Sequence, residues 1–255
     1  MKTLATMSAL LIGAMLASAQ TTEELTTKEV FSGKNGAKLL YRQYVPKDLA
    51  PDAKIPLVLF LHGAGERGDD NTAQLKHGVG AIIKYSQEKQ MPIAMLVPQC
   101  PNSQMWVNKP WGATSHHMDK SPTGNLAMVL SLLKEKITSL PIDPNRVYVT
   151  GISMGGYGTW EIIQREPTLF AAAIPICGGG DTREARRIRD LPIWVFHGDA
   201  DMAVPVERSR AMVTALWGCG GHVYYREYPN MNHDVWTRTY NDREVLDWLF
   251  KQKRR

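Results

Sequence analysis

The sequence has little cysteine, which limits any disulfide framework. The three cysteines among its 255 residues are Cys100, Cys177 and Cys219, so at least one thiol is unpaired. Cys100 and Cys177 both follow predicted strands and could be neighbours, and the sequence leaves open whether they are bonded. We expect buried free thiols, because an unpaired cysteine packs as a small apolar side chain.

The sequence also lacks an apolar run of the roughly 20 residues that a membrane span needs. The run 4–16 follows a lysine at position 2 and precedes Ala-Ser-Ala at 17–19, which is the pattern of a secretory signal peptide and its cleavage site. We therefore expect residues 1–19 to be removed. The mature chain, residues 20–255, would be secreted or periplasmic, with no stable membrane insertion. An uncleaved anchor is the alternative.

A concentrated charge of one sign is missing as well. The net charge is +5, but the basic residues are dispersed and cluster only at 251–255, where a frayed chain end explains them. This pattern gives no support for a nucleic-acid partner. His116 and His117 adjoin Asp119 without a matching ligand set at metal-binding spacing, so we expect no metal and no cofactor.

Strand-like and helix-like segments alternate along the rest of the chain, without a repeat, linker or low-complexity tract. Strands are predicted at 29–32, 38–45, 56–61, 92–97, 146–150, 170–176, 192–196 and 223–228. Helices are predicted at 72–87, 124–140, 154–165, 206–217 and 241–251. This order predicts a single α/β domain with a doubly wound, mostly parallel sheet and antiparallel strands near its N-terminus. With 44% hydrophobic residues, the chain can bury the core of one such domain.

A serine flanked by glycines directly follows one of these strands. Residues 151–156 read Gly-Ile-Ser-Met-Gly-Gly and come after the β-branched run 146–150. This is the sequence form of a nucleophile elbow, in which a strained turn from strand to helix exposes the serine hydroxyl at the carboxyl edge of a sheet. The alternative is a glycine-rich turn in which Ser153 occurs by chance.

Candidate partners for Ser153 follow two later strands. Asp199 and Asp201 lie in the loop after strand 192–196, and His233 follows strand 223–228. Serine, acid and histidine therefore occur in the chain order of a hydrolase triad, each after a strand of one sheet. A serine hydroxyl is a poor nucleophile at neutral pH, so it needs a base, and a carboxylate must orient that base.

Together these segments resemble the α/β-hydrolase superfamily. More narrowly, they are similar to small, lidless carboxylesterases of the acyl-protein thioesterase, polyhydroxybutyrate depolymerase and feruloyl or acetylxylan esterase type. The matching segments are 61–68, 97–101, 151–156, 175–181, 197–205 and 232–236. They cover most of the mature chain and are specific for serine hydrolase chemistry, but much less so for the substrate.

The resemblance assigns roles to individual residues. The family pattern in the loop 197–205 favours Asp201 over Asp199 as the triad acid. It also implies an oxyanion hole made by the backbone N–H groups of Met154 and Ala64, with Gly65 as the alternative to Ala64. The segment 178–191 leaves no room for a sizeable lid.

Five residues are expected to bind the substrate: Gly65, Gln99, Trp106, Trp111 and Trp236. Two of the tryptophans belong to the long loop 99–123, which leaves the carboxyl end of a strand and should wall one side of the pocket. Their rings could stack on a sugar or on an aromatic acyl group. Packing of this loop against the body of the protein is the alternative.

Other polar residues near these segments are expected to be structural. His62 and His197 each precede a glycine at the end of a buried strand, where histidines commonly hydrogen-bond the surrounding loops. Glu66, Arg67 and Asp69 are expected to form an ion-pair network that supports the loop after His62, with contact to the substrate as the alternative.

The sequence therefore predicts a secreted serine carboxylesterase that works through an acyl-enzyme, with feruloyl or acetyl esters of plant polysaccharides as the expected substrates. A general short-chain esterase and a prolyl-oligopeptidase-like peptidase are alternatives that use the same machinery. The non-enzymatic alternative is a hydrolase-fold binding module, which would usually lack a triad member. The sequence does not indicate an oligomeric state.

Overall fold

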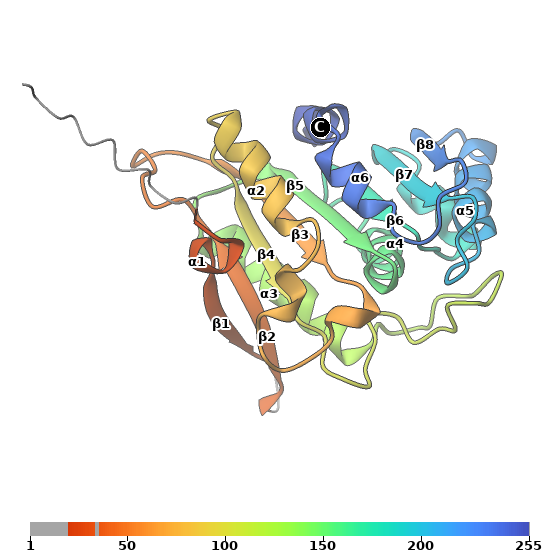
Figure 1. Ribbon diagram of the computed structural model, residues 1–255, viewed down its shortest axis with the longest axis horizontal. Coiled ribbons are helices and arrows are strands. Elements are labelled where there is room, and N and C mark those ends of the chain that lie inside the picture. Colours follow the sequence, from red (N-terminus) through yellow and green to blue (C-terminus); the bar gives the residue numbers. More distant parts are fainter. Residues whose placement is uncertain (1–19, 34–35, 255) are drawn as a thin grey trace, which may run out of the picture.

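The computed structural model of the protein describes residues 20–33 and 36–254 (Figure 1). The expected signal peptide, residues 1–19, lies outside this described part of the chain. Within it, none of the helices has both the length and the apolar character that crossing a bilayer requires. The described residues form one α/β domain around an 8-stranded sheet.

The sheet has the strand order β1-β2-β4-β3-β5-β6-β7-β8. The pairs β1/β2 and β2/β4 are antiparallel, and all pairs from β4 across to β8 are parallel. The strands are β1 Thr27–Ser32, β2 Lys38–Tyr44, β3 Ile55–Leu61, β4 Ala94–Pro98, β5 Ile142–Ile152, β6 Ala172–Ile176, β7 Ile193–Gly198 and β8 Val223–Tyr228. This arrangement confirms the predicted mostly parallel sheet with antiparallel N-terminal strands.

Burial along the strands follows this topology. β3, β4, β6 and β7 are buried at every position, as expected for parallel strands that are covered on both faces. β1 forms one edge of the sheet and contains no fully buried residue. β8 forms the opposite edge and mixes buried with exposed positions.

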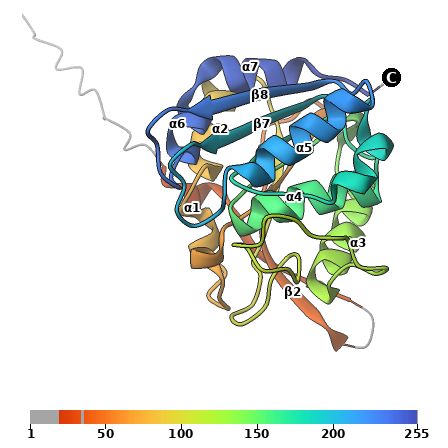
Figure 2. The same cartoon turned by 90° about the vertical axis from the view of Figure 1, so that its right-hand side faces the viewer.

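Helices cover both faces of the sheet (Figures 1 and 2). One face packs against α3, α4 and α5, for example through Leu133, Ile162 and Met212. The other face packs against α2, α6 and α7, for example through Ile82 and Leu249. The helices are α1 Thr22–Leu25, α2 Val79–Glu88, α3 Gly124–Ser139, α4 Met154–Arg165, α5 Glu207–Gly218, α6 Trp236–Asn241 and α7 Arg243–Lys251.

The helix predicted at 72–87 is wrong in its extent. The segment divides into the 3-10 helix η3, Ala73–Leu75, and the helix α2. Gly78 separates them with a φ of 73°, which interrupts a helix. A side chain at this position would also meet two aromatic rings at 2.7 Å, so the break is fixed by tertiary packing.

The end of the chain contains two helices, α6 and α7, where the sequence predicts only one at 241–251. Asp242 divides them, because its extended backbone ends α6 and its side chain accepts the N–H of Glu244 in the first turn of α7. The extra helix, α6, begins at Trp236, just after the loop that carries His233.

The absence of a large lid agrees with the prediction. In the described structure, the only helix between β6 and β7 is the 3-10 helix η4, Thr182–Ile188. The carboxyl ends of β5, β7 and β8 therefore open toward solvent without an inserted helical cap. The loops that follow these three strands carry Ser153, Asp201 and His233.

Candidate active site

Ser153 lies between β5 and α4 in a backbone conformation that few residues adopt. Its φ is 54° and its ψ is −117°, outside the regions that ordinary L-residues prefer. The Ser153 N–H donates to the carbonyl oxygen of Ile176 at 2.9 Å, which ties the turn to β6. The residue is partly exposed at the carboxyl edge of the sheet, which is the position of a nucleophile elbow.

The glycines around Ser153 are required by close backbone contacts. A Cβ on Gly151 would lie 2.3 Å from the carbonyl oxygen of Gly155, and a Cβ on Gly155 would lie 1.9 Å from that of Leu61. On Gly156, a Cβ would lie 2.3 Å from the carbonyl oxygen of Ile176. Only glycine allows α4 to approach β3 and β6 this closely, and this approach shapes the turn at Ser153.

The imidazole of His233 joins the side chains of Ser153 and Asp201. Its Nε2 lies 2.8 Å from Ser153 Oγ, and its Nδ1 lies 2.6 Å from Asp201 Oδ2. An ionised carboxylate can only accept hydrogen bonds, so Nδ1 carries the proton and Nε2 accepts from the serine hydroxyl. The structure thus brings together the three side chains that the sequence suggested, whereas Asp199 is exposed.

The side chain of Asp201 is fully buried and is surrounded by donors. Its Oδ1 accepts the N–H groups of Ala203 at 2.8 Å and Val204 at 2.9 Å. Burial raises the pKa of the Asp201 carboxyl, but hydrogen bonds from His197, His233 and Val204 outweigh it and hold this pKa well below its ordinary value. Asp201 is therefore ionised at neutral pH.

His197 supports Asp201 from the protein interior. Its Nε2 lies 3.1 Å from Asp201 Oδ2 and 3.0 Å from the carbonyl oxygen of Val204. Both of these partners accept, so Nε2 carries a proton. Its Nδ1 lies 2.7 Å from Ser209 Oγ on α5, and the ring is fully buried. This placement agrees with the structural role that the sequence suggests for His197.

Asn232 links the two loops that carry Asp201 and His233. Its Oδ1 accepts the N–H of Met202 at 3.1 Å and the N–H of His233 at 2.8 Å. Met202 itself is 89% exposed at the rim, beside Asp201. Neither residue was predicted as part of the site. Their only signal was their adjacency to His233 and Asp201.

The loop after β3 passes directly beside Ser153. A Cβ on Gly63 would lie 3.6 Å from the Cβ of Ser153. The next residue, Ala64, opens the 3-10 helix η2, Ala64–Glu66, and Met154 opens α4. N–H groups at the first position of a helix have no acceptor within that helix. Gly65 is exposed, and a Cβ there would meet nothing within 4 Å.

His62 holds this loop in place through hydrogen bonds at both of its ring nitrogens. Its Nε2 accepts the N–H of Cys100 at 2.9 Å, so Nδ1 carries the proton and donates to the carbonyl oxygen of Gly63 at 2.6 Å. Burial lowers the pKa of His62 to about 4, which keeps the ring neutral at physiological pH. The structural role expected for His62 agrees with these contacts.

Two of the expected substrate contacts are wrong, because both side chains are inside the protein. Gln99 is buried; its Nε2 donates to Asp70 Oδ1 at 2.8 Å, and its Oε1 accepts the N–H of Asn71 at 2.7 Å. Trp106 is fully buried, and its Nε1 donates to the carbonyl oxygen of His62 at 3.1 Å. Both side chains hold loops of the site in place and cannot touch a substrate.

The other two aromatic candidates have different surroundings. Trp236 is almost fully buried, and its ring packs edge-on against His233 with centroids 5.1 Å apart, so its contact is with the imidazole instead of a ligand. Trp111 is partly buried, and the guanidinium of Arg67 lies 5.8 Å from its ring centroid. A substrate contact by Trp111 stays a prediction, as it does for Gly65.

The ion-pair network expected after His62 is also wrong. Glu66 is buried and faces His77, whose Nε2 lies 3.5 Å from Glu66 Oε1. Arg67 instead donates from Nε to the carbonyl oxygen of Ala64 at 2.9 Å. The ring of His77 in turn packs against Trp236 with centroids 5.6 Å apart. The loop after His62 is thus linked to Trp236, which packs against His233, through the ring of His77 and not through an Arg–Glu ion pair.

The long loop 99–123 is held against the body of the protein near the site. Tyr157 of α4 donates its hydroxyl to the carbonyl oxygen of Trp111 at 2.9 Å, and Asp181 accepts the N–H of Met118 at 2.8 Å. His116 Nδ1 contacts the guanidinium of the buried Arg208 on α5. These contacts are the packing against the body of the protein that the sequence left open as the alternative, and a substrate-facing wall made by this loop stays a prediction.

The cysteines are free in the described structure, and Cys100 and Cys177 are buried. Cys177 lies close to His233, with its Sγ 3.4 Å from the carbonyl oxygen of that residue. Its Sγ, the Asp201 carboxylate and His233 could together offer donors to a metal ion. However, two of these possible metal ligands, Asp201 Oδ2 and His233 Nδ1, already form a hydrogen bond with each other at 2.6 Å.

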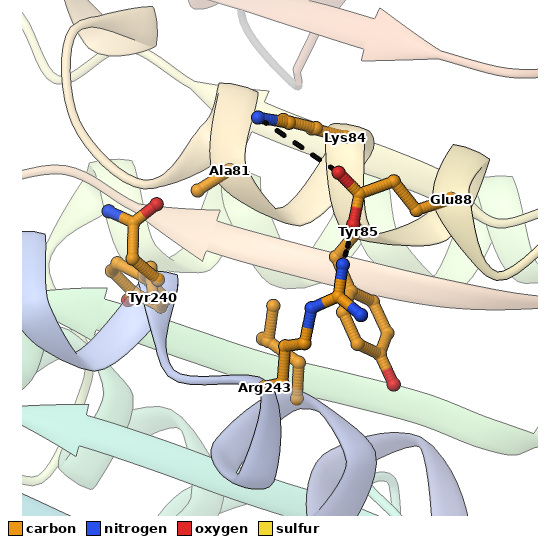
Figure 3. A pocket seen from close by; sticks show the side chains of 8 residues that line it. Ala81, Lys84, Tyr85, Glu88, Tyr240 and Arg243 are labelled. Atoms are coloured by element: carbon orange, nitrogen blue, oxygen red, sulfur yellow. Dashed lines mark hydrogen bonds and ion pairs between the residues drawn. The ribbon is translucent and has the colours of Figure 1, made fainter.

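Figure 3 shows a hollow of about 180 Å³ in a different part of the molecule, between α2 and the α6–α7 segment. One ion pair crosses it, because Glu88 of α2 lies 2.5 Å from Arg243 of α7; Glu88 also lies 3.9 Å from Lys84 on its own helix. None of its lining residues belongs to the loops that carry the triad side chains.

Comparison with known proteins places this site in a family context. Residues 50–244 match the family model described as phospholipase/carboxylesterase. Acyl-protein thioesterase 1 from Gibberella zeae is 22% identical over 215 residues, which cover 70% of this chain and 83% of that protein. A poly(3-hydroxybutyrate) depolymerase from Ralstonia pickettii is 29% identical over 141 residues, which cover 54% of this chain and 28% of the depolymerase.

Solved structures show the same architecture. A thermostable esterase superposes with a TM-score of 0.84 at 42% identity, covering 90% of this chain and 64% of that chain. A ferulic acid esterase superposes with a TM-score of 0.66 at 16% identity, covering 89% of this chain and 98% of that chain. The chain thus spans less than two thirds of both the thermostable esterase and the depolymerase.

Proposed function

The chain belongs to the phospholipase/carboxylesterase family, and from that premise we propose that it is a serine carboxylesterase with Ser153, His233 and Asp201 as its catalytic triad. The observation that carries the proposal is the continuous hydrogen-bond path from Ser153 Oγ through His233 to Asp201, with contacts of 2.8 and 2.6 Å. A binding module would not need this path.

In the acylation step, Ser153 Oγ attacks the carbonyl carbon of the ester while His233 Nε2 takes the hydroxyl proton. The resulting imidazolium is stabilised by the ionised Asp201, which already accepts from Nδ1. His233 then gives the proton to the leaving alcohol, and the acyl group remains on Ser153. In the second step a water molecule attacks this acyl-enzyme, with His233 again taking and returning the proton, and the acid is released.

The negative charge on the tetrahedral intermediate needs N–H donors next to Ser153. We assign these donors to the backbone N–H groups of Met154 and Ala64, which are the first residues of α4 and η2. The loss of one such donor typically costs on the order of 3 kcal/mol of transition-state stabilisation. His62 helps to orient the second donor, because it binds the carbonyl oxygen of Gly63, which lies in the same planar peptide group as the Ala64 N–H.

For the substrate, we propose feruloyl or acetyl esters on plant polysaccharides. The fold similarity to a ferulic acid esterase supports this assignment. So does the 26% identity, over 179 residues, to a bifunctional acetylxylan esterase/xylanase from Neocallimastix patriciarum. The site is also open, with no helical cap in the described chain, so a bulky alcohol portion can approach Ser153.

The test is a comparison of kcat/KM on methyl ferulate and p-nitrophenyl butyrate, with Ser153→Ala as the control. Hydrolysis of both esters that vanishes in the variant supports the serine esterase, and preference for the ferulate supports the cell-wall substrate. Hydrolysis of the butyrate alone indicates a general short-chain esterase. If neither ester is hydrolysed, the esterase proposal fails.

We further propose that the protein is exported and that residues 1–19 are removed. The support is the sequence pattern alone, a lysine followed by an apolar run and Ala-Ser-Ala. N-terminal sequencing of protein produced from the full gene in a secreting host tests it. A first residue of Gln20 in the exported fraction is expected, and an intact Met1 in a cell-retained fraction would contradict it.

A further inference from the structure

A second hollow, of about 570 Å³, lies at the free edge of the sheet and is lined by aromatic and charged side chains in equal number. Trp194 comes from β7, Tyr224 comes from β8, and the others come from α7. We call this surface the edge patch; its residues are Trp194, Tyr224, Glu244, Asp247, Trp248 and Lys251. Figure 2 shows α7, β8 and β7 next to one another at this edge.

The aromatic rings of the edge patch form a connected group. Trp248 packs edge-on against Trp194, with centroids 5.4 Å apart, and against Tyr224, with centroids 6.1 Å apart. Trp194 is nearly buried and forms the floor, where the guanidinium of Arg226 lies 5.0 Å from its ring. Tyr224 is 61% exposed, so much of its ring is available to a ligand. A contiguous group of aromatic side chains at the surface, rimmed by polar residues, commonly marks a binding surface.

The charged residues of the edge patch lie along α7 beside these rings. Glu244 is held at 2.9 Å by Arg226, and Asp247 is held at 2.9 Å by Lys89. These ion pairs hold the carboxylates in place at the side of the hollow. Carboxylates that are fixed next to aromatic rings offer acceptors to a ligand rich in hydroxyl groups.

We propose that the edge patch binds a polysaccharide chain. The C–H faces of pyranose rings pack on aromatic rings such as that of Tyr224, while the sugar hydroxyls bond to the carboxylates of Glu244 and Asp247. A protein partner fits less well, because the centres of protein interfaces are depleted of charged residues and half of the residues in this patch are charged. The hollow also has the volume usual for a small-molecule site.

The position of the edge patch relative to the triad suits a polymeric substrate. Trp194 and Tyr224 lie near the amino ends of β7 and β8, whereas Asp201 and His233 follow the carboxyl ends of the same strands. A six-residue strand is about 20 Å long, so one extended oligosaccharide can reach from the patch toward the Ser153 side. Binding at the patch would keep a polymer at the enzyme between hydrolytic events.

This inference rests on the proposed function for its choice of ligand, and the experiment separates the two. Affinity electrophoresis in gels that contain soluble arabinoxylan measures binding by Ser153→Ala, which cannot consume the feruloyl esters. The second variant, Tyr224→Ala, is placed in the same background. Trp217→Ala is the matched control, because Trp217 is 59% exposed but belongs to α5, on the other face of the sheet.

We expect arabinoxylan to retard Ser153→Ala and Trp217→Ala equally, and Tyr224→Ala to bind about tenfold more weakly, as the loss of one aromatic contact predicts. With Ser153 intact, Tyr224→Ala should keep its kcat/KM on methyl ferulate and lose activity only on feruloylated arabinoxylan. No retardation of Ser153→Ala, or equal retardation of Tyr224→Ala, overturns the site. A dimer in sedimentation that Tyr224→Ala dissociates, without retardation by arabinoxylan, assigns the edge to a second copy and also overturns it. Arabinoxylan binding without hydrolysis of any ester leaves the site standing and rejects the proposed function.

Discussion

His197 and His233 bind the same carboxylate oxygen of Asp201, at 3.1 and 2.6 Å. One imidazole is partly exposed at the surface of the site, and the other is fully buried behind the carboxylate. Asp201 is thereby held from both sides, with the backbone N–H groups of Ala203 and Val204 on its second oxygen. The orientation of His233 consequently depends on residues that do not face the substrate.

The first prediction concerns the two aspartates of this loop. Asp201→Asn should lower kcat by on the order of 10⁴-fold, because an amide donates where a carboxylate accepts and so favours the wrong tautomer of His233. Asp199→Asn is the matched control, since Asp199 is exposed in the same loop, and its kcat should stay within about twofold of the wild-type value. Similar losses in both variants would contradict Asp201 as the triad acid.

The second prediction concerns His197 as a positioning residue. His197→Leu removes the donor to Asp201 and should lower kcat about tenfold with little change in KM, as expected for the loss of one hydrogen bond to a charged group. His197→Gln retains an amide donor and should recover part of that loss. If kcat falls equally in both variants and tracks only the loss of folded protein, His197 supports the fold and does not position Asp201.

Much of the fold could be predicted because burial of parallel strands leaves a strong signal in the sequence. β3 and β7 are buried at every position, and their apolar runs are continuous. The break at Gly78 was not predictable, because it depends on two aromatic rings that approach from β3 and α6. The division at Asp242 was missed because a capping aspartate inside a helical pattern looks like an ordinary surface residue.

Prediction of the candidate site from the sequence is limited in the same way as prediction of the fold. The proximity of Ser153, Asp201 and His233 could be predicted because each follows a strand, and the parallel sheet brings those strand ends together. In strands and helices the direction of a side chain follows a regular period along the sequence, but within a loop it does not. Trp106 lies in the loop expected to wall the pocket, yet its ring points inward to His62. Only tertiary contacts decide whether such a residue faces the substrate or the core.

The third prediction tests the close packing behind the nucleophile. Gly155→Ala places a Cβ 1.9 Å from the carbonyl oxygen of Leu61, and neither backbone can move without displacing β3 or α4. We expect a loss of about 3 kcal/mol in the free energy of unfolding, measured by urea denaturation. Gly65→Ala is the control, because its Cβ meets nothing within 4 Å, and its stability should be unchanged. Equal stability of the two variants would contradict the tight elbow.

The fourth prediction concerns metals. Dialysis against EDTA should leave kcat/KM unchanged, because the proposed mechanism activates Ser153 through His233 without a metal, and His233 Nδ1 and Asp201 Oδ2 are already bonded to each other. The sulfur of Cys177, the third possible metal ligand, is also a poor one. Burial, together with the Asp201 carboxylate, holds the pKa of the Cys177 thiol well above its ordinary value, and metals bind the thiolate. Loss of activity in EDTA that zinc or calcium restores would contradict this account.

The last prediction concerns stability in weak acid. The pKa of His62 is lowered by burial to about 4 in the folded protein, and the unfolded chain should titrate near the ordinary 6.5. Between these two values the unfolded chain binds a proton that the folded protein excludes. The free energy of unfolding should therefore be unaffected by His62 above about pH 6.5 and should fall by about 3 kcal/mol as the pH drops to about 4.

Urea denaturation at about pH 7 and about pH 4.5 measures this loss, and both pH values lie above the ordinary pKa of aspartate, about 3.9. His62→Gln should reduce the loss, because an amide can keep the contacts with Cys100 and Gly63 without binding a proton. Burial and the nearby Arg208 also lower the pKa of His116 to about 4. His116→Gln should therefore also reduce the loss in the free energy of unfolding between these two pH values. If both single variants lose as much stability as the wild type between these pH values, neither buried neutral histidine controls it, and other groups must bind the proton on unfolding.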